Sequence, residues 1–111
     1  MTVTVKVLVP AKIAEATQTT QYTATGVTTI IDKFTATNYS GVAATISINL
    51  VTVSGSAGNL NLITKTKTLQ PSEVYTFPEI VGQVLMAGDF ISTIAGTATS
   101  INIRASGREV S

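Results

Sequence analysis

The sequence predicts an all-β fold, a single-domain antiparallel β-sandwich or jelly roll of about eight strands that spans residues 1–111. Apolar and polar residues alternate along most of the chain, which is the period of a strand with one buried and one wet face. Short turn-forming segments separate these runs. No run of helical period is long enough to connect parallel strands, so the sheets are expected to be antiparallel. A chain of 111 residues holds one such domain.

The first strand is expected at residues 2–9, where valine alternates with threonine and lysine. Its apolar face consists of Val3, Val5, Val7 and Val9. Full burial of a valine side chain contributes roughly 1.5 to 3 kcal/mol, so this face should be covered by adding the strand to a sheet. That sheet belongs either to the same chain or to a neighbouring subunit, and we favour pairing within the chain.

The segment after the first strand is expected to leave the sheet. Pro10 should end the strand, and residues 11–16, AKIAEA, should form a bridge with some helical character. A terminal strand followed by a bridge can be exchanged between subunits at little cost. Residues 1–16 are therefore a candidate N-terminal arm.

Four strands are expected in the middle of the chain. Residues 17–22 form a short strand, and residues 27–38 form a longer one that ends in the hairpin sequence NYSG. The return strand, residues 42–53, has the clearest alternation of the whole chain. The flexible sequence SGSAGN separates it from the strand at residues 60–69.

Three strands are expected in the last third of the chain. Pro71 is pre-set for the turn that leads into residues 74–77. Residues 78–85 are expected to form either one helical turn, because proline suits the first helical position, or an ordered extended loop. Strands at residues 90–95 and 99–106 complete the fold.

Asp32 breaks the alternation of its strand, because it has the same parity as Ile30 and Phe34. Two explanations are open. Either a β-bulge shifts the register at this point, or the carboxylate is paired inside the fold, with Lys33 or Arg104 as conceivable partners.

The chain contains no histidine and no cysteine. It lacks the usual general base near neutral pH, the thiol nucleophile, the common serine triad and thiolate metal ligands. The carboxylates of Glu73, Glu79 and Asp89 are interpreted as turn and cap residues. No calcium-loop or phosphate-loop motif is present. We therefore expect a protein that is not an enzyme and has no catalytic residue, cofactor, metal site or small-molecule substrate.

The charge pattern narrows the class of partner. Seven basic and six acidic residues form no basic stripe of the kind that nucleic acid requires, and no apolar run is as long as a membrane span. Twenty threonines and a charged fraction of 12 %, about half the common share, fit two interpretations. One is a surface that another protein covers, and the other is a charge-poor soluble β-domain. The lack of cysteine favours a reducing compartment.

Three of the six aromatic residues fall around residues 78–88, namely Tyr75, Phe77 and Phe90. An exposed aromatic platform in this region would indicate a carbohydrate- or surface-binding β-module of a fibre or adhesin. Phe77 and Phe90 are more consistent with core positions.

Three segments resemble a known family. They are YTATGVTTIIDKFTATNYSGVAATISINLV, EIVGQVLMAGDFIST and the closing INIRASGREVS. With them, about residues 20–111 resemble the capsid decoration (cement or staple) proteins of short-tailed phages of the epsilon-fifteen type. The resemblance implies a small β-sandwich made in the host cytoplasm that binds the outer surface of the assembled capsid. Such proteins clamp neighbouring major capsid subunits, often as homodimers, against the pressure of packed DNA.

The resemblance gives no matched contact residues, so the candidates come from the chain itself. The first strand is a candidate for subunit or capsid contact by strand addition. Two arginines near the end of the chain are candidates for bidentate pairs with capsid carboxylates. The candidate contact residues are Thr2, Val3, Thr4, Val5, Lys6, Val7, Leu8, Val9, Arg104 and Arg108.

Overall fold

The computed structural model describes residues 1–111. It contains nine strands, which form where apolar and polar residues alternate. The strands are β1 (Val3–Ile13), β2 (Thr19–Thr23), β3 (Thr28–Asn38), β4 (Ala44–Val51), β5 (Leu62–Leu69), β6 (Val74–Thr76), β7 (Val84–Leu85), β8 (Phe90–Ala95) and β9 (Ile101–Val110). One short 3-10 turn, η1 (Asn59–Asn61), precedes β5. All pairings are antiparallel, which confirms the predicted all-β class.

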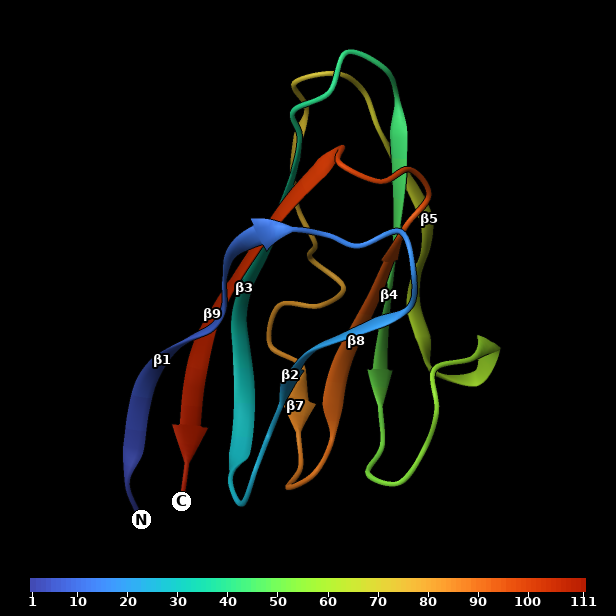
Figure 1. Cartoon of the computed structure of the whole chain (residues 1–111). Coiled ribbons are helices and arrows are strands. Elements are labelled where there is room, and N and C mark those ends of the chain that lie inside the picture. The colour runs from blue at the N-terminus through green and yellow to red at the C-terminus, as the bar shows by residue number, and fades with distance from the viewer.

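The strands form two sheets that pack face to face (Figure 1). Sheet A has the order β1-β9-β3-β6, with β7 also paired to β3, and sheet B has the order β2-β8-β4-β5. The chain folds as one long antiparallel ribbon that wraps around the core. The successive strand pairs of this ribbon, which we call its rungs, are β1·β9, β2·β8, β3·β6 and β4·β5. This nesting of first with last and second with next-to-last is the connectivity of a jelly roll. The predicted β-sandwich is therefore confirmed.

The core lies between the two sheets and is made of the inward residues of each strand. In β4, Ile46 and Ile48 are fully buried, and in β9 Ile101 and Ile103 face them from the other sheet with at most 1 % exposure. Phe34 and Phe77 are fully buried and meet edge to face, with ring centroids 5.5 Å apart. Edge-to-face packing is a favoured geometry for aromatic pairs.

Strand β1 differs from the prediction in its length. It continues through Pro10 to Ile13 and pairs with β9 along its whole course. Proline does not end it because β1 is an edge strand, where a missing N–H leaves no partner unsatisfied on the open side. The bridge with helical character predicted for residues 11–16 is therefore wrong over its first half. The predicted pairing of the first strand within its own chain is confirmed.

Strand β1 also differs in the face that its valines occupy. The register with β9 shifts between Val7 and Val9 and again between Val9 and Lys12. These irregularities let the consecutive residues Leu8 and Val9 both face the core, at 4 % and 0 % exposure. Val3, Val5 and Val7 face solvent instead, with 52 %, 83 % and 41 % exposure. The expectation that four valines share one buried face is wrong for three of them, because the bulge shifts the phase of the alternation.

A bulge in β3 explains Asp32. Ile31 pairs with Gly107 and Lys33 pairs with Ser106, so Asp32 is the extra residue in the ladder. Its side chain points to solvent beside Arg108. The bulge explanation is confirmed, and the partner of the carboxylate is neither Lys33 nor Arg104.

Residues 78–85 form turns followed by a two-residue strand, with no regular helix. The carbonyl of Phe77 accepts hydrogen bonds from the N–H groups of Ile80 and Val81. Strand β7 then pairs with the first part of β3, Val84 opposite Ile30. This pairing extends sheet A at the end that holds the two chain termini.

Candidate interaction surface

Sheet A has one side against the core and one side that no element covers. Along β9, buried Ile101, Ile103 and Ala105 alternate with exposed Asn102 and Arg104. The register carries this orientation to β1, β3 and β7. We call the uncovered side the outer face of sheet A; it is formed by Val3, Val5, Val7, Ile30, Lys33, Thr35, Thr37, Val84, Asn102, Arg104, Ser106, Arg108 and Val110.

The end of this face near the chain termini is apolar. One cross-strand row runs Val5, Arg108, Ile30, Val84 through β1, β9, β3 and β7. The neighbouring row places Val3 beside Val110. Half of the Val84 side chain is exposed. Scattered single apolar residues are ordinary on a protein surface, whereas a contiguous apolar group marks an interaction site.

Arg108 lies in the middle of this apolar end and is held by Asp32. Its Nε and Nη2 donate to the two carboxylate oxygens, at 3.0 Å for Nε–Oδ2 and 2.8 Å for Nη2–Oδ1. The hydrogen bonds from the guanidinium lower the pKa of Asp32, and the carboxylate raises the pKa of Arg108. The fork-shaped pair fixes the guanidinium in one orientation on the sheet.

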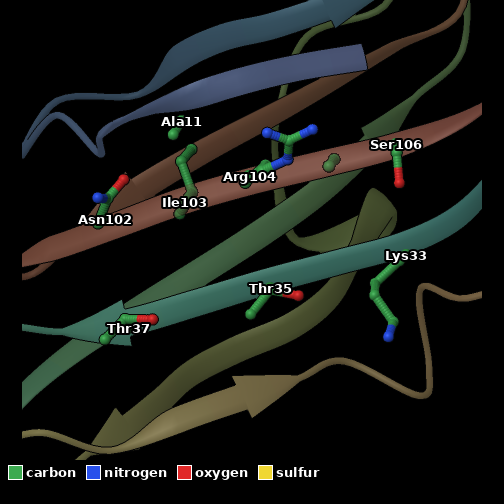
Figure 2. A pocket seen from close by; sticks show the side chains of 9 residues that line it. Ala11, Lys33, Thr35, Thr37, Asn102, Ile103, Arg104 and Ser106 are labelled. Atoms are coloured by element: carbon green, nitrogen blue, oxygen red, sulfur yellow. The ribbon is translucent and has the colours of Figure 1, made fainter. Parts of the chain in front are cut away.

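The other end of the face is a shallow groove with a volume of about 290 Å³. Figure 2 shows Arg104 and Ser106 on β9 opposite Lys33, Thr35 and Thr37 on β3. Neither Arg104 nor Lys33 takes part in a salt bridge. Two uncompensated cations among hydroxyl groups form a surface that suits the carboxylates of another protein.

The structure separates the predicted contact residues into three groups. Val3, Val5, Val7, Arg104 and Arg108 lie together on the outer face of sheet A. Thr2, Thr4 and Lys6 belong to the same segment as the three valines but point to the opposite side of sheet A. There the Lys6 ammonium is 3.2 Å from the Glu109 carboxylate. Leu8 and Val9 are in the core and present no surface to a partner.

Ile30, Lys33 and Val84 are among the residues of the face that sequence reasoning missed. The apolar doublet of Ile30 and Ile31 was a usable signal, because two neighbouring residues of a strand without a bulge point to opposite faces. Val84 gave no signal, since its strand is two residues long.

A buried hydrogen-bond network lies on the inner side of the same end. The Tyr22 hydroxyl is 2.6 Å from the Thr29 hydroxyl and donates to the Glu109 carboxylate at 2.5 Å. Burial, followed by the hydrogen bond to Glu109, raises the pKa of Tyr22 to about 12. The hydrogen bond from Tyr22 lowers the pKa of Glu109. The network links β2 of sheet B to β3 and β9 of sheet A.

The three carboxylates weighed as candidate catalytic groups make local hydrogen bonds. Glu73 accepts from the Gln70 N–H, and Asp89 accepts from the N–H groups of Val53 and Met86. Glu79 accepts from the hydroxyl of Thr64 at 2.5 Å. No group of three or more acidic side chains lies close enough together to hold a metal ion.

The aromatic residues do not form an exposed platform. Phe34 and Phe77 are buried, and Tyr75 packs against Phe77 with ring centroids 4.8 Å apart. Among the large exposed apolar and aromatic side chains, the one aromatic is Tyr39, with 49 % exposure. The arrangement that a carbohydrate-binding module would use for stacking is therefore absent.

A second hollow of about 190 Å³ lies on the outer side of sheet B. Two of its polar side chains bond within the chain: Gln18 donates to Asn49 at 3.3 Å and to Ser92 at 2.8 Å, and Asn49 donates to Asn61 at 2.7 Å. Because these groups are satisfied within the chain, the hollow offers few free donors to a ligand.

No family model, curated protein or solved structure matches this chain. None of its segments forms a helix long and apolar enough to cross a membrane.

Proposed function

We propose that this chain is a structural virion protein that binds the outer surface of a phage capsid and reinforces the contacts between major capsid subunits. It is made in the host cytoplasm and acts without catalysis. The proposal combines the resemblance of about residues 20–111 to capsid decoration proteins with one structural observation. That observation is the uncovered outer face of sheet A, where an apolar end adjoins a groove with two uncompensated cations.

The chemistry of the face supports a protein partner with exposed carboxylates. Arg104 and Lys33 have no acidic partner in the chain, and Arg108 is oriented by Asp32. Carboxylates of a capsid subunit would form ion pairs with Arg104 and Lys33, while apolar side chains of that subunit would cover Val5 and Ile30. The jelly-roll fold itself is compatible with this role but does not assign it, since the fold occurs in viral capsid domains and in lectins alike.

The proposal is tested by co-sedimentation of the purified chain with bare shells assembled from the major capsid protein of the same genome. We expect the chain to sediment with the shells in a fixed saturating ratio and to raise the temperature at which they break. A chain that stays in the supernatant at all concentrations would contradict the proposal.

Charge-reversal variants locate the contact. Arg104→Glu and Lys33→Glu should each weaken shell binding at least about tenfold, because each replaces an attraction with a repulsion. Lys65→Glu is the matched control, since it makes the same charge change at the hollow on sheet B and should bind like the wild type. Equal loss in all three variants would show that net charge, and not the outer face of sheet A, governs binding.

A further inference from the structure

Strand β1 has an open edge of unusual regularity. Residues Val3 to Val7 pair with β9 in continuous register, Val3 with Val110 through Val7 with Ser106. The other side of this stretch has no neighbouring strand, because β1 is the first strand of sheet A. An edge of this kind presents unpaired backbone N–H and C=O groups, which are a template for another strand.

The backbone groups on the open edge can be identified. Thr2 and Ser111 exchange two N–H···O bonds at 2.9 Å, which makes them a hydrogen-bonded pair. Hydrogen-bonded pairs recur at every second residue of an antiparallel ladder, so Thr4 and Lys6 also direct their N–H and C=O groups toward β9. The N–H and C=O groups of Val3, Val5 and Val7 therefore point away from the molecule.

The remaining sheet edges are less suited to pairing. On the far side of sheet A the edge consists of β6 and β7, which have three and two residues. In sheet B, the register of β2 with β8 shifts after Thr20, and β5 is interrupted at Thr66, whose φ is +45°. Only β1 offers five consecutive residues in regular extended form.

We propose that β1 pairs with β1 of a second copy of this chain, antiparallel and about a two-fold axis through Val5. Val5 would exchange two backbone hydrogen bonds with Val5 of the second copy, and Val3 would do so with Val7 at each end. Such an interface is isologous, so it closes at two copies and leaves no further edge of β1 open. That capsid decoration proteins are often homodimers is what the resemblance implies; the β1 edge adds the strand that joins the two copies and its register.

Charge and bonding select this register over its neighbours. With the axis at Val5, the Lys6 side chain lies across from Thr4 of the second copy, and its ammonium stays on Glu109 of its own chain. An axis at Lys6 would place two lysines directly opposite each other, which is unfavourable. An axis at Thr4 would set Val7 opposite Met1, which lies outside the strand. Pro10 and the bulge after Val7 limit the pairing to this stretch.

The dimer would also join two outer faces. Side chains of Val3, Val5 and Val7 point to the outer face of sheet A and are 52 %, 83 % and 41 % exposed. Across the seam each would lie beside a valine of the second copy. The result is one continuous sheet with a valine stripe at its centre and a cationic groove on either side.

Sedimentation velocity of the full chain in the absence of shells tests the association. We expect a reversible species with twice the 11.5 kDa chain mass that grows with concentration. Val5→Pro removes the N–H on the symmetry axis and should be monomeric, yet it should stay folded because that N–H has no partner within the chain. Val5→Thr is the matched control; it keeps the N–H and a β-branched shape and should still dimerise. A wild-type chain that remains a monomer at every concentration would overturn the proposal.

Single cysteines test the register, and the chain has no cysteine of its own. Val5→Cys should form a disulfide-linked dimer under mild oxidation, because residues facing each other in a hydrogen-bonded pair have Cα atoms about 5.5 Å apart. Val3→Cys should cross-link at least about tenfold more slowly, because four residues along the strand separate the two thiols by about 13 Å. A mixture of Val3→Cys and Val7→Cys should cross-link readily. Equal rates for Val5→Cys and Val3→Cys would overturn the proposed pairing, even where Val5→Pro fails to fold.

Discussion

Gly107 lies on β9 between β1 and β3, where a side chain would have no room. It pairs with Lys6 on β1 and with Ile31 on β3, at the residue before the Asp32 bulge. A Cβ atom at this position would overlap the carbonyl oxygen of Ile30 and press on the Leu8 side chain. The bulge and the glycine therefore depend on each other, since the bent strand occupies the space that a side chain would need.

Replacing Gly107 tests this dependence. Gly107→Ala should lower the free energy of unfolding by about 1 to 3 kcal/mol, because the clash is with backbone that cannot move aside cheaply. Denaturant unfolding followed by circular dichroism measures the change. Gly41→Ala is the control, because a Cβ there meets no atom within 4 Å. Equal effects of the two substitutions would contradict the close approach at Gly107.

Tyr22, which is buried, and Glu109, which accepts its hydrogen bond, give the fold two opposite pH dependences. The pKa of Glu109 is lowered in the folded chain, so its contribution is complete above the ordinary value of 4.5 and is lost as the pH falls through the lower folded value. The pKa of Tyr22 is raised from 10.0 to about 12. Its contribution is therefore complete below pH 10 and is lost as the pH rises toward 12.

We expect the Tyr22→Phe variant to be less stable near neutral pH and to lose part of the alkaline dependence between pH 10 and 12; the rest comes from Tyr75, whose pKa is also raised, by burial and by Glu79. The acid dependence should weaken but persist, because the pKa values of Glu15 and Asp32 are also lowered. Unfolding curves across the pH range measure both slopes. Tyr39→Phe, at an exposed tyrosine, should match the wild type. An unchanged alkaline slope in Tyr22→Phe would contradict the assignment.

At the scale of elements, β1 shows how a bulge changes the meaning of a sequence pattern. Val3, Val5, Val7 and Val9 alternate perfectly, yet the shift after Val7 places only the last of them in the core. Leu8, which the alternation would assign to the wet face, becomes a core residue with 4 % exposure. Because of the shift, residues 3–7 of the strand provide surface, whereas Leu8 and Val9 fill the interior.

Truncating side chains on the two halves of β1 tests this division. Leu8→Ala should cost about 2 to 5 kcal/mol of unfolding free energy, because it leaves a cavity between the sheets. Val5→Ala should cost well under about 1 kcal/mol, because its side chain is already in water. The measurement is denaturant unfolding at low protein concentration, where association does not contribute. A larger loss of unfolding free energy for Val5→Ala than for Leu8→Ala would show that the alternation is not shifted.

An element could be predicted where the signal for it lies within a short stretch of the sequence. Strands such as β4 and β8 were placed to within a few residues because alternation and turn chemistry are local signals. The Asp32 bulge was one of the two explanations that the sequence left open, because the acid interrupts an apolar parity. The bulge in β1 left no such trace, and β7 is too short to produce a period. The groove of Arg104 and Lys33 depends on β9 pairing with β3, and no local pattern in either strand specifies that neighbour.

At the scale of the whole molecule, the ribbon of nested pairs makes most of the stabilising contacts distant in sequence. The outermost rung joins β1 to β9 and the next joins β2 to β8. Closing such long loops costs entropy before the contacts form, so folds of this kind form slowly. Only β4 and β5 are neighbours both in sequence and in a sheet. We infer that the β4–β5 hairpin forms early and the β1–β9 rung forms late.

Stopped-flow refolding tests this order. The chain should refold on a timescale of roughly milliseconds to seconds. A destabilising substitution in the late rung, such as Leu8→Ala, should act mainly by accelerating unfolding, whereas Ile46→Ala in β4 should mainly slow refolding. The reverse assignment of the two effects would contradict the inferred order.

The pairing of β1 with β9 has a consequence for the chain as it leaves the ribosome. Strand β1 is translated before β9, the strand that pairs with it and helps to cover Leu8 and Val9. Those side chains lack this cover until β9 has left the ribosome, so sheet A cannot close before then. A chain truncated before β9 would leave β1 without the strand that pairs with it. Such products should be good substrates for cellular proteases.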